Sequence, residues 1–335
     1  MVDFENNSEP VTYTLEDARQ SLLKNDERFT AAVSHGLSDV PTAMTNDLNS
    51  LWRSLNVLTR QQLIAHLVEA AEVNFELNFK AVGLIGLQDE DETVREKSVE
   101  LLWEDESTET LEILAKMAVL DASEQVRAAA VGALGRFVLL GEYGKLPERY
   151  TQLAQDTAVQ VWTNESEQNS VRRRALEAIA NSSHEIVPEA VIAAYRSADE
   201  QMIASAIYAM GNTCDERWAP SVLRELGSET PAHRYEATRA AGELELKAAI
   251  QPLGRIALND ERDIQELAIW ALGEIGGDLA SKVLDRLETY YEEQEDDAML
   301  EVIEEAVANA SLAMSMDLSD VFGLPDYGDE DNYPH

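Results

Sequence analysis

A ten-residue phrase recurs along this chain at a nearly constant spacing, and this periodicity restricts the possible folds more than any other feature. Its copies are VREKSVELLW (94–103), VRAAAVGALG (126–135), VRRRALEAIA (171–180), MIASAIYAMG (202–211), HRYEATRAAG (233–242), IQELAIWALG (264–273) and a weaker MLEVIEEAVA (299–308). The first six copies begin 31 or 32 residues apart, except for one gap of 45 that predicts an inserted loop and a lengthened helix. A fixed period of this length indicates a repeat architecture.

A second amphipathic segment precedes the phrase, as in TLEILAKMAVL (110–120) and AAIQPLGRIAL (248–258). Apolar residues recur there at intervals of three and four, which is typical of a helix with one buried stripe. Each unit is therefore predicted to be a helical hairpin. Because a lone hairpin cannot bury its stripe, successive hairpins must stack, and the sequence predicts an all-α solenoid of about seven hairpins over residues 75–313.

The succession of a first helix, an Asp-rich turn, Val-Arg, small residues and Ala-Leu-Gly resembles the HEAT repeat, in particular its short, bacterial, PBS-lyase-like form. The resemblance covers roughly residues 75–313. It implies a right-handed alpha-alpha superhelix of the HEAT or armadillo type. For function it implies less, because relatives of this kind include adaptors, assistants of phycobilin attachment and metal-dependent oxidoreductases.

The resemblance also implies a ladder of polar contacts between repeats, formed by an arginine and an aspartate six residues before it. Asp89 with Arg95 and Asp121 with Arg127 match this spacing. Later copies depart from it, and these departures leave the continuity of the ladder open. Arg172 and Arg234 are preceded by Ser166 and Ser228, while Ile203 and Gln265 stand in place of the arginine.

The two ends of the chain lack the phrase. Residues 1–74 read as three or four helices, with Thr14 and Thr59 as expected N-caps, and are predicted to form an N-terminal helical cap. Residues 314–335 mix glycine, proline and acidic residues without a period, and are predicted to be an acidic flexible tail.

The formal net charge of −38 opposes contact with nucleic acid and with anionic membranes. The excess of acid also allows an adaptation to high salt. No signal peptide and no membrane-spanning stretch is expected from the sequence. Cys214 is the sole cysteine, which excludes an internal disulfide and suits a reducing compartment. The prediction is a soluble cytoplasmic protein.

Residues that could carry catalysis are sparse. His184-Glu185 is a single His-Glu pair, too few ligands for a two-metal site, and the remaining histidines are scattered. Cys214 has acidic neighbours, which disfavour a reactive thiolate. No phosphate-binding glycine loop occurs. The sequence therefore predicts a protein that is not an enzyme, with no cofactor and no metal.

The face of the second helices that points away from the core is the predicted binding surface. With the first residue of each phrase as position zero, positions +2, +6 and +9 lie opposite the buried side. The predicted contact residues on or beside this stripe are Trp103, Arg173, Arg174, Tyr208, Tyr235, Arg239 and Trp270. Tyr, Trp and Arg are enriched at the centres of protein interfaces. Burial of the aromatic rings between neighbouring helices is the alternative interpretation.

The function predicted from the sequence is a non-catalytic scaffold or adaptor that binds a protein or peptide on its concave face. The alternative is an accessory subunit or enzyme of the phycobilin-lyase-like or HEAT-oxidoreductase type. Aromatic and acidic residues of the tail, among them Tyr327 and Asp329, also suggest self-interaction, because they complement a stripe of Arg, Tyr and Trp.

Overall fold

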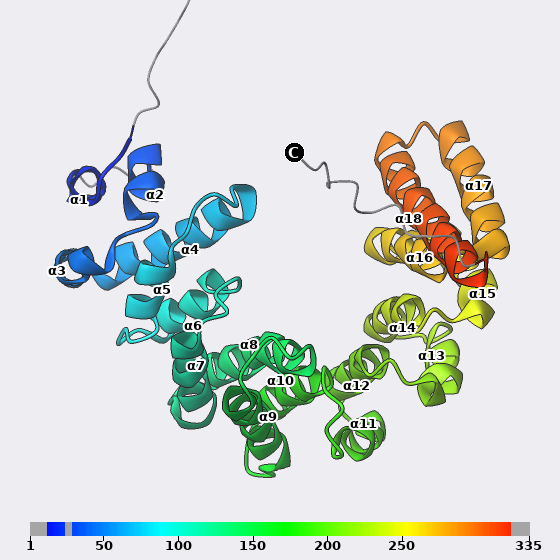
Figure 1. Cartoon of the computed structure of the whole chain (residues 1–335), viewed down its shortest axis with the longest axis horizontal. Helices are drawn as coiled ribbons and strands as arrows, with labels where there is room; N and C mark the ends of the chain where they lie inside the picture. The colour runs from blue at the N-terminus through cyan, green and yellow to red at the C-terminus, as the bar shows by residue number, and fades with distance from the viewer. Residues whose placement is uncertain (1–11, 24–28, 323–335) are drawn as a thin grey trace, which may run out of the picture. The chain divides into compact units, whose positions relative to one another are not determined.

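The computed structural model describes residues 12–23 and 29–322, and their side chains as far as residue 310. All regular secondary structure in these ranges is helical. The chain divides into two compact units, residues 1–179 (unit 1) and 180–335 (unit 2), which are described separately below (Figure 1).

The helices follow one another as hairpins within each unit. Unit 1 contains α1 (Leu15–Leu23), α2 (Ala31–Leu37), the 3-10 helix η1 (Thr42–Met44), α3 (Thr45–Ser54), α4 (Val57–Val73), α5 (Lys80–Gly86), α6 (Glu92–Leu101), α7 (Thr108–Leu120), α8 (Glu124–Glu142), α9 (Glu148–Thr163) and α10 (Asn169–Ile179). Unit 2 contains α11 (Val187–Tyr195), α12 (Glu200–Asn212), η2 (Glu216–Trp218), α13 (Ala219–Glu225), α14 (Pro231–Glu243), η3 (Lys247–Ala249), α15 (Ile250–Asn259), α16 (Arg262–Ile275), α17 (Gly277–Glu293) and α18 (Asp297–Phe322).

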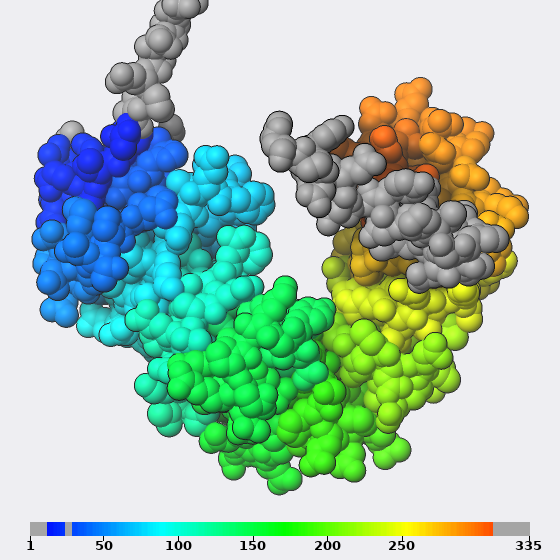
Figure 2. Space-filling model, viewed as in Figure 1, coloured from blue at the N-terminus to red at the C-terminus, as the bar shows by residue number. Residues whose placement is uncertain are grey.

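Each unit is built from two layers of helices. In unit 1, α4, α6, α8 and α10 pack side by side, and in unit 2 α12, α14, α16 and α18 do the same; we call these the even layers. The odd-numbered helices pack against them as the odd layers, where α7 contacts α9 and α15 contacts α17. In the space-filling view, neighbouring hairpins of each unit touch on the face turned to the viewer (Figure 2).

The seven predicted hairpins are the pairs from α5/α6 to α17/α18, so the all-α repeat fold is confirmed. Helices α3 and α4 precede them, and α4 packs against α6, so the predicted boundary at residues 74 and 75 falls inside unit 1. The gap of 45 residues holds the lengthened α8 and α9, of 19 and 16 residues. Helix α18 continues to Phe322, through residues assigned from sequence to the tail, and residues 323–335 lie outside the described range.

Helical periodicity decides which residues reach the core. Val126, Ala130 and Leu134, at positions zero, +4 and +8 of their phrase, are fully buried on α8. Thr14 caps α1 as predicted, accepting a hydrogen bond from the Asp17 amide while its own amide donates to the Asp17 carboxylate at 2.8 Å. The cap of α4 is Asn56 rather than Thr59, because the Asn56 side chain accepts from the Thr59 amide.

An arginine ladder links successive hairpins, but its pairing differs from the expected one. The guanidinium of Arg95 donates to both carboxylate oxygens of Asp121, at 2.9 and 2.8 Å, and to the backbone carbonyl of Asp89 in its own hairpin. Each carboxylate is thus held by the arginine of the preceding hairpin. The other pairs of this kind are Arg60 with Asp89, Arg127 with Glu167, Arg234 with Asp260 and Arg262 with Asp296.

The sequence departures are compensated at neighbouring positions. Glu167 replaces the serine at 166 as the acceptor, and Arg262 supplies the guanidinium that Gln265 cannot. Arg172 does not take part in a ladder pair of this kind. Its guanidinium donates to the backbone carbonyl of Trp162 at 3.0 Å and lies over the Trp162 ring.

The ion pair between Arg234 and Asp260 should make the stability of the fold depend on pH in acid. Hydrogen bonding by Arg234 keeps the pKa of Asp260 below its usual range. Ionised Asp260 therefore stabilises the fold above about pH 4, and this contribution is lost as the pH falls through the lowered pKa. We expect the difference in melting temperature between the unmodified chain and Arg234→Gln to be large at neutral pH and to shrink below about pH 4. Thermal melts followed by circular dichroism measure this, and a constant difference down to pH 2 would contradict it.

Candidate functional site

Three predicted contact residues lie on the even layer of unit 1. Trp103 follows the end of α6 and is 49% exposed. Arg173 and Arg174 lie on α10, and both guanidinium groups contact Glu177, at 3.6 and 2.6 Å. The Arg174 side chain is 47% exposed, whereas that of Arg173 is largely covered.

Between these residues runs a strip of small side chains on α8, formed by Ala128, Ala129 and Gly132, which we call the α8 strip. All three are partly exposed. A side-chain carbon added at Gly132 would meet only Arg174, at 3.8 Å from its Cδ atom. The aliphatic part of Arg174 therefore lies beside the α8 strip. Trp103 lies in the turn after α6, the helix that packs on the other side of α8.

In unit 2 the stripe residues mostly join helices to one another. The guanidinium of Arg239 lies 3.9 Å from the centre of the Tyr208 ring and donates to the Tyr208 carbonyl oxygen at 2.9 Å. It also bonds Asn212, Glu236 and Glu243. These contacts connect α12 with α14 and leave the Arg239 side chain 15% exposed. A charge reversal at Arg239 would therefore report on packing as well as on binding.

The prediction that position +9 points away from the repeats is wrong. Gly211, Gly242 and Gly273 occupy this position, and all are buried. A side-chain carbon at Gly242 would lie 2.8 Å from the Trp270 ring and 3.0 Å from the Ala271 Cα atom. The glycines permit close approach of neighbouring even-layer helices, and Trp270 is packed across that contact rather than presented freely.

Tyr235 is the stripe residue of unit 2 that remains open, with 36% of its surface exposed. The structure thus brings Tyr208 and Arg239 together, and it places Trp103, Arg173 and Arg174 on a separate unit. Tyr208, Arg239 and Trp270 are only partly buried, in contacts between neighbouring helices, which is closer to the alternative interpretation of the stripe. Trp103, Arg174 and Tyr235 keep substantial exposed surface.

Sequence reasoning missed an open cleft in unit 1, between α3, α4 and α5. Its volume is about 1130 Å³, and its walls include Arg53, Arg60 and Lys80 beside Asp89 and Glu90. Most of the basic charge is already neutralised: Arg60 pairs with Asp89 and Glu90, and Lys80 pairs with Asp105. The cleft is consequently a mixed polar surface and not an anion pocket.

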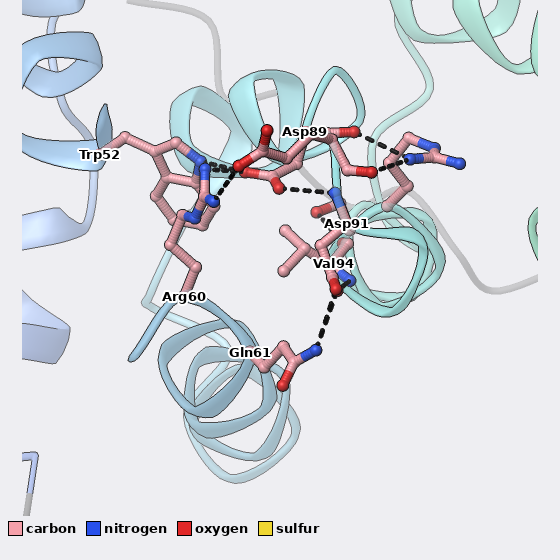
Figure 3. A network of polar contacts seen from close by, with 9 residues as sticks. Trp52, Arg60, Gln61, Asp89, Asp91 and Val94 are labelled. Carbon is pink, nitrogen blue, oxygen red and sulfur yellow. Dashed lines mark hydrogen bonds and ion pairs between the residues drawn. The ribbon is translucent and has the colours of Figure 1, made fainter. Parts of the chain in front are cut away.

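A polar network forms one wall of this cleft (Figure 3). The indole nitrogen of Trp52 and the guanidinium of Arg60 both donate to the same carboxylate oxygen of Asp89, at 2.7 and 2.9 Å. Gln61 donates to Asp91, and this hydrogen bond lowers the pKa of Asp91, which also caps α6. The Asp89 side chain is 1% exposed, so the network fixes α3 and α4 to the turn before α6.

Residues 219–308 match the family model for HEAT repeats. The chain contains HEAT repeats. No curated protein matches its sequence.

Several solved structures are similar to this HEAT-repeat protein. YibA of Escherichia coli is 13% identical, with a TM-score of 0.41, and the match covers 82% of this chain and 98% of YibA. Importin beta is 14% identical, with a TM-score of 0.47, over 92% of this chain and 48% of importin beta. Human deoxyhypusine hydroxylase in complex with glycerol is 19% identical, with a TM-score of 0.35, over 78% and 95% of the two chains.

His184 and Cys214, the residues considered above for metal binding and nucleophilic catalysis, lie between helices of this HEAT-repeat protein. The His184 ring accepts a hydrogen bond from the Ile186 amide just before α11, and Cys214 is exposed in a turn with a positive φ of 49°. In the described ranges, no three His, Cys, Asp or Glu side chains converge as metal ligands. None of the described helices combines the length and the apolar character needed to cross a membrane.

Proposed function

We propose that this HEAT-repeat protein is a non-catalytic scaffold that binds a protein partner on the even layer of unit 1. The observation that carries the proposal is the exposure of Trp103, in the turn after α6, and of Arg174 on α10, the two helices that pack on either side of α8. The proposal includes a cytoplasmic location, which suits a chain with a single cysteine.

The chemistry of these side chains fits a protein interface. Burying a tryptophan against a partner removes a large apolar area from water, and Trp and Arg dominate the binding energy of many interfaces. The small residues of the α8 strip would let a helix or an extended segment approach closely between these two anchors. Glu177 partly neutralises Arg173 and Arg174, so shape and apolar contact contribute alongside charge.

Tyr235 offers a further contact on unit 2. Its exposed ring lies on α14, the helix that also carries Arg239. Because Tyr208, Arg239 and Trp270 are engaged in packing between helices, we assign unit 2 a smaller share of the binding energy.

The double variant Trp103→Ala with Arg174→Glu tests this proposal. Partners are first captured with the unmodified chain and identified by mass spectrometry, and affinities are then measured with the purified partner. Since each altered anchor costs about 2 kcal/mol, each single variant should lower the affinity about thirtyfold, and the double variant should lower it by up to about a thousandfold.

The matched control is Leu120→Ala with Lys116→Glu on α7, in the odd layer, where both side chains are exposed. It changes one apolar residue and one cation and should leave the affinity unchanged. Equal affinities of both double variants would place the binding surface elsewhere. Stoichiometric iron or a bound pigment in the purified protein would contradict the non-catalytic assignment.

A further inference from the structure

The odd layer at the end of unit 2 carries four cations without an ion-pair partner among the described residues. They are Lys247 on η3, Arg255 on α15, and Lys282 and Arg286 on α17, and all four are exposed. By contrast, Arg234, Arg239 and Arg262 of the same unit are each paired with carboxylates. These four cations lie in the odd layer of a chain whose net charge is −38, and no described carboxylate pairs with them.

Exposed apolar side chains lie beside these cations. Leu258 of α15 is 36% exposed, and Leu279 and Tyr290 of α17 are 48% and 41% exposed. Helices α15 and α17 are in contact, and a side-chain carbon at Gly254 would lie 2.9 Å from Val283. The two helices are therefore closely packed at that point.

Helical geometry places these residues along the line of contact. Leu258 lies one turn from Gly254 on α15, and Leu279 and Arg286 lie one turn from Val283 on α17. We call this surface the α15–α17 seam, formed by Arg255, Leu258, Leu279, Lys282, Arg286 and Tyr290. It combines three cations with three exposed apolar groups, which suits a ligand that is both acidic and aromatic.

We propose that the α15–α17 seam binds residues 323–335 of the same chain. This segment, GLPDYGDEDNYPH, contains four acidic residues together with Leu324, Tyr327 and Tyr333. Its acidic groups complement Arg255, Lys282 and Arg286, and its apolar groups complement Leu258, Leu279 and Tyr290. The sequence suggested contact of this segment with the predicted concave stripe, but Arg239 there is already surrounded by Glu236, Glu243 and Asn212.

The length of the segment is sufficient for this contact. Helix α18 pairs with α17 as a hairpin and is nine residues longer, so it ends about 14 Å beyond the start of α17, the end of α17 at which Leu279 is found. Helix α17 has 17 residues and is about 25 Å long. The segment after Phe322 can span about 43 Å when extended, which is enough to return along α17 from Leu279 to Tyr290. Attachment to the same chain gives an effective concentration of about 1 mM, so weak contacts suffice.

A paramagnetic label on the full chain tests the proposal, which stands independently of the proposed function. A nitroxide is attached at Asn332→Cys in a Cys214→Ser background, and amide signals are compared before and after reduction of the label. We expect the intensities of the α17 amides between Leu279 and Tyr290 to be at least halved by the active label. High salt should restore them by screening the charges.

Two variants decide whether the seam is responsible. Lys282→Glu with Arg286→Glu should abolish the broadening, whereas Lys116→Glu with Lys145→Glu, the same charge change at exposed lysines of unit 1, should leave it intact. Absence of broadening in the full chain, or its persistence in the seam variant, would overturn the proposal. Broadening that appears only between labelled and isotope-enriched copies in a mixture would assign the contact to a second copy and overturn the same-chain assignment.

Discussion

Replacing Asp89 with alanine should lower the free energy of unfolding of unit 1 by about 3–5 kcal/mol. The carboxylate is almost completely buried and accepts from Trp52, from Arg60 and from the Asp91 amide. Its removal leaves the Trp52 indole nitrogen and a largely buried guanidinium without their acceptor. Urea unfolding gives the total effect, and amide exchange in α3 and α4 shows whether the loss is local.

Two milder changes separate charge from shape at this position. Asp89→Asn keeps the size of the side chain and one acceptor, so its cost should fall between those of the alanine variant and the unmodified chain. Glu90 is the other carboxylate bound to Arg60, and its side chain is 78% exposed. Its replacement by glutamine removes this charge and should cost less than about 1 kcal/mol. If Asp89→Ala were as stable as Glu90→Gln, the network in Figure 3 would not hold these helices together.

Replacing Gly273 with alanine should destabilise unit 2 by about 1–3 kcal/mol. The added carbon would lie 2.9 Å from both the Cα atom and the carbonyl oxygen of Ala306. Backbone atoms cannot rotate away as a side chain can, so α16 and α18 would have to separate. Thermal and urea unfolding measure the loss.

The same substitution at Gly132 is the matched control, and its effect should have the opposite sign. The added carbon would make only ordinary contacts with Arg174, at 3.8 and 3.9 Å. Alanine is favoured over glycine inside a helix, so Gly132→Ala should stabilise unit 1 by about 0.5–1 kcal/mol. If Gly273→Ala and Gly132→Ala changed the free energy of unfolding in the same direction, the close helix packing described for position +9 would be contradicted.

The sequence alone determined the repeat fold, because a helix of 3.6 residues per turn converts spacing directly into a buried face. The periodic phrase identified the seven hairpins and the core residues Val126, Ala130 and Leu134. It also identified Arg95 and Arg127 as ladder residues. It did not identify Glu167 or Arg262 as ladder residues, because pairing depends on which side chain a neighbouring turn brings within reach.

Only the tertiary structure decided which stripe residues remain exposed. The angle of a residue around its own helix does not specify how closely the next helix approaches. Tyr208, Arg239 and Trp270 occupy position +6, one turn from the glycine at position +9 of the same helix. Those glycines allow the neighbouring helices to approach closely, and the side chains at +6 are partly covered by that contact. Trp103 is the large residue at position +9, in the turn after α6, where the later copies carry glycine or alanine, and it stays exposed.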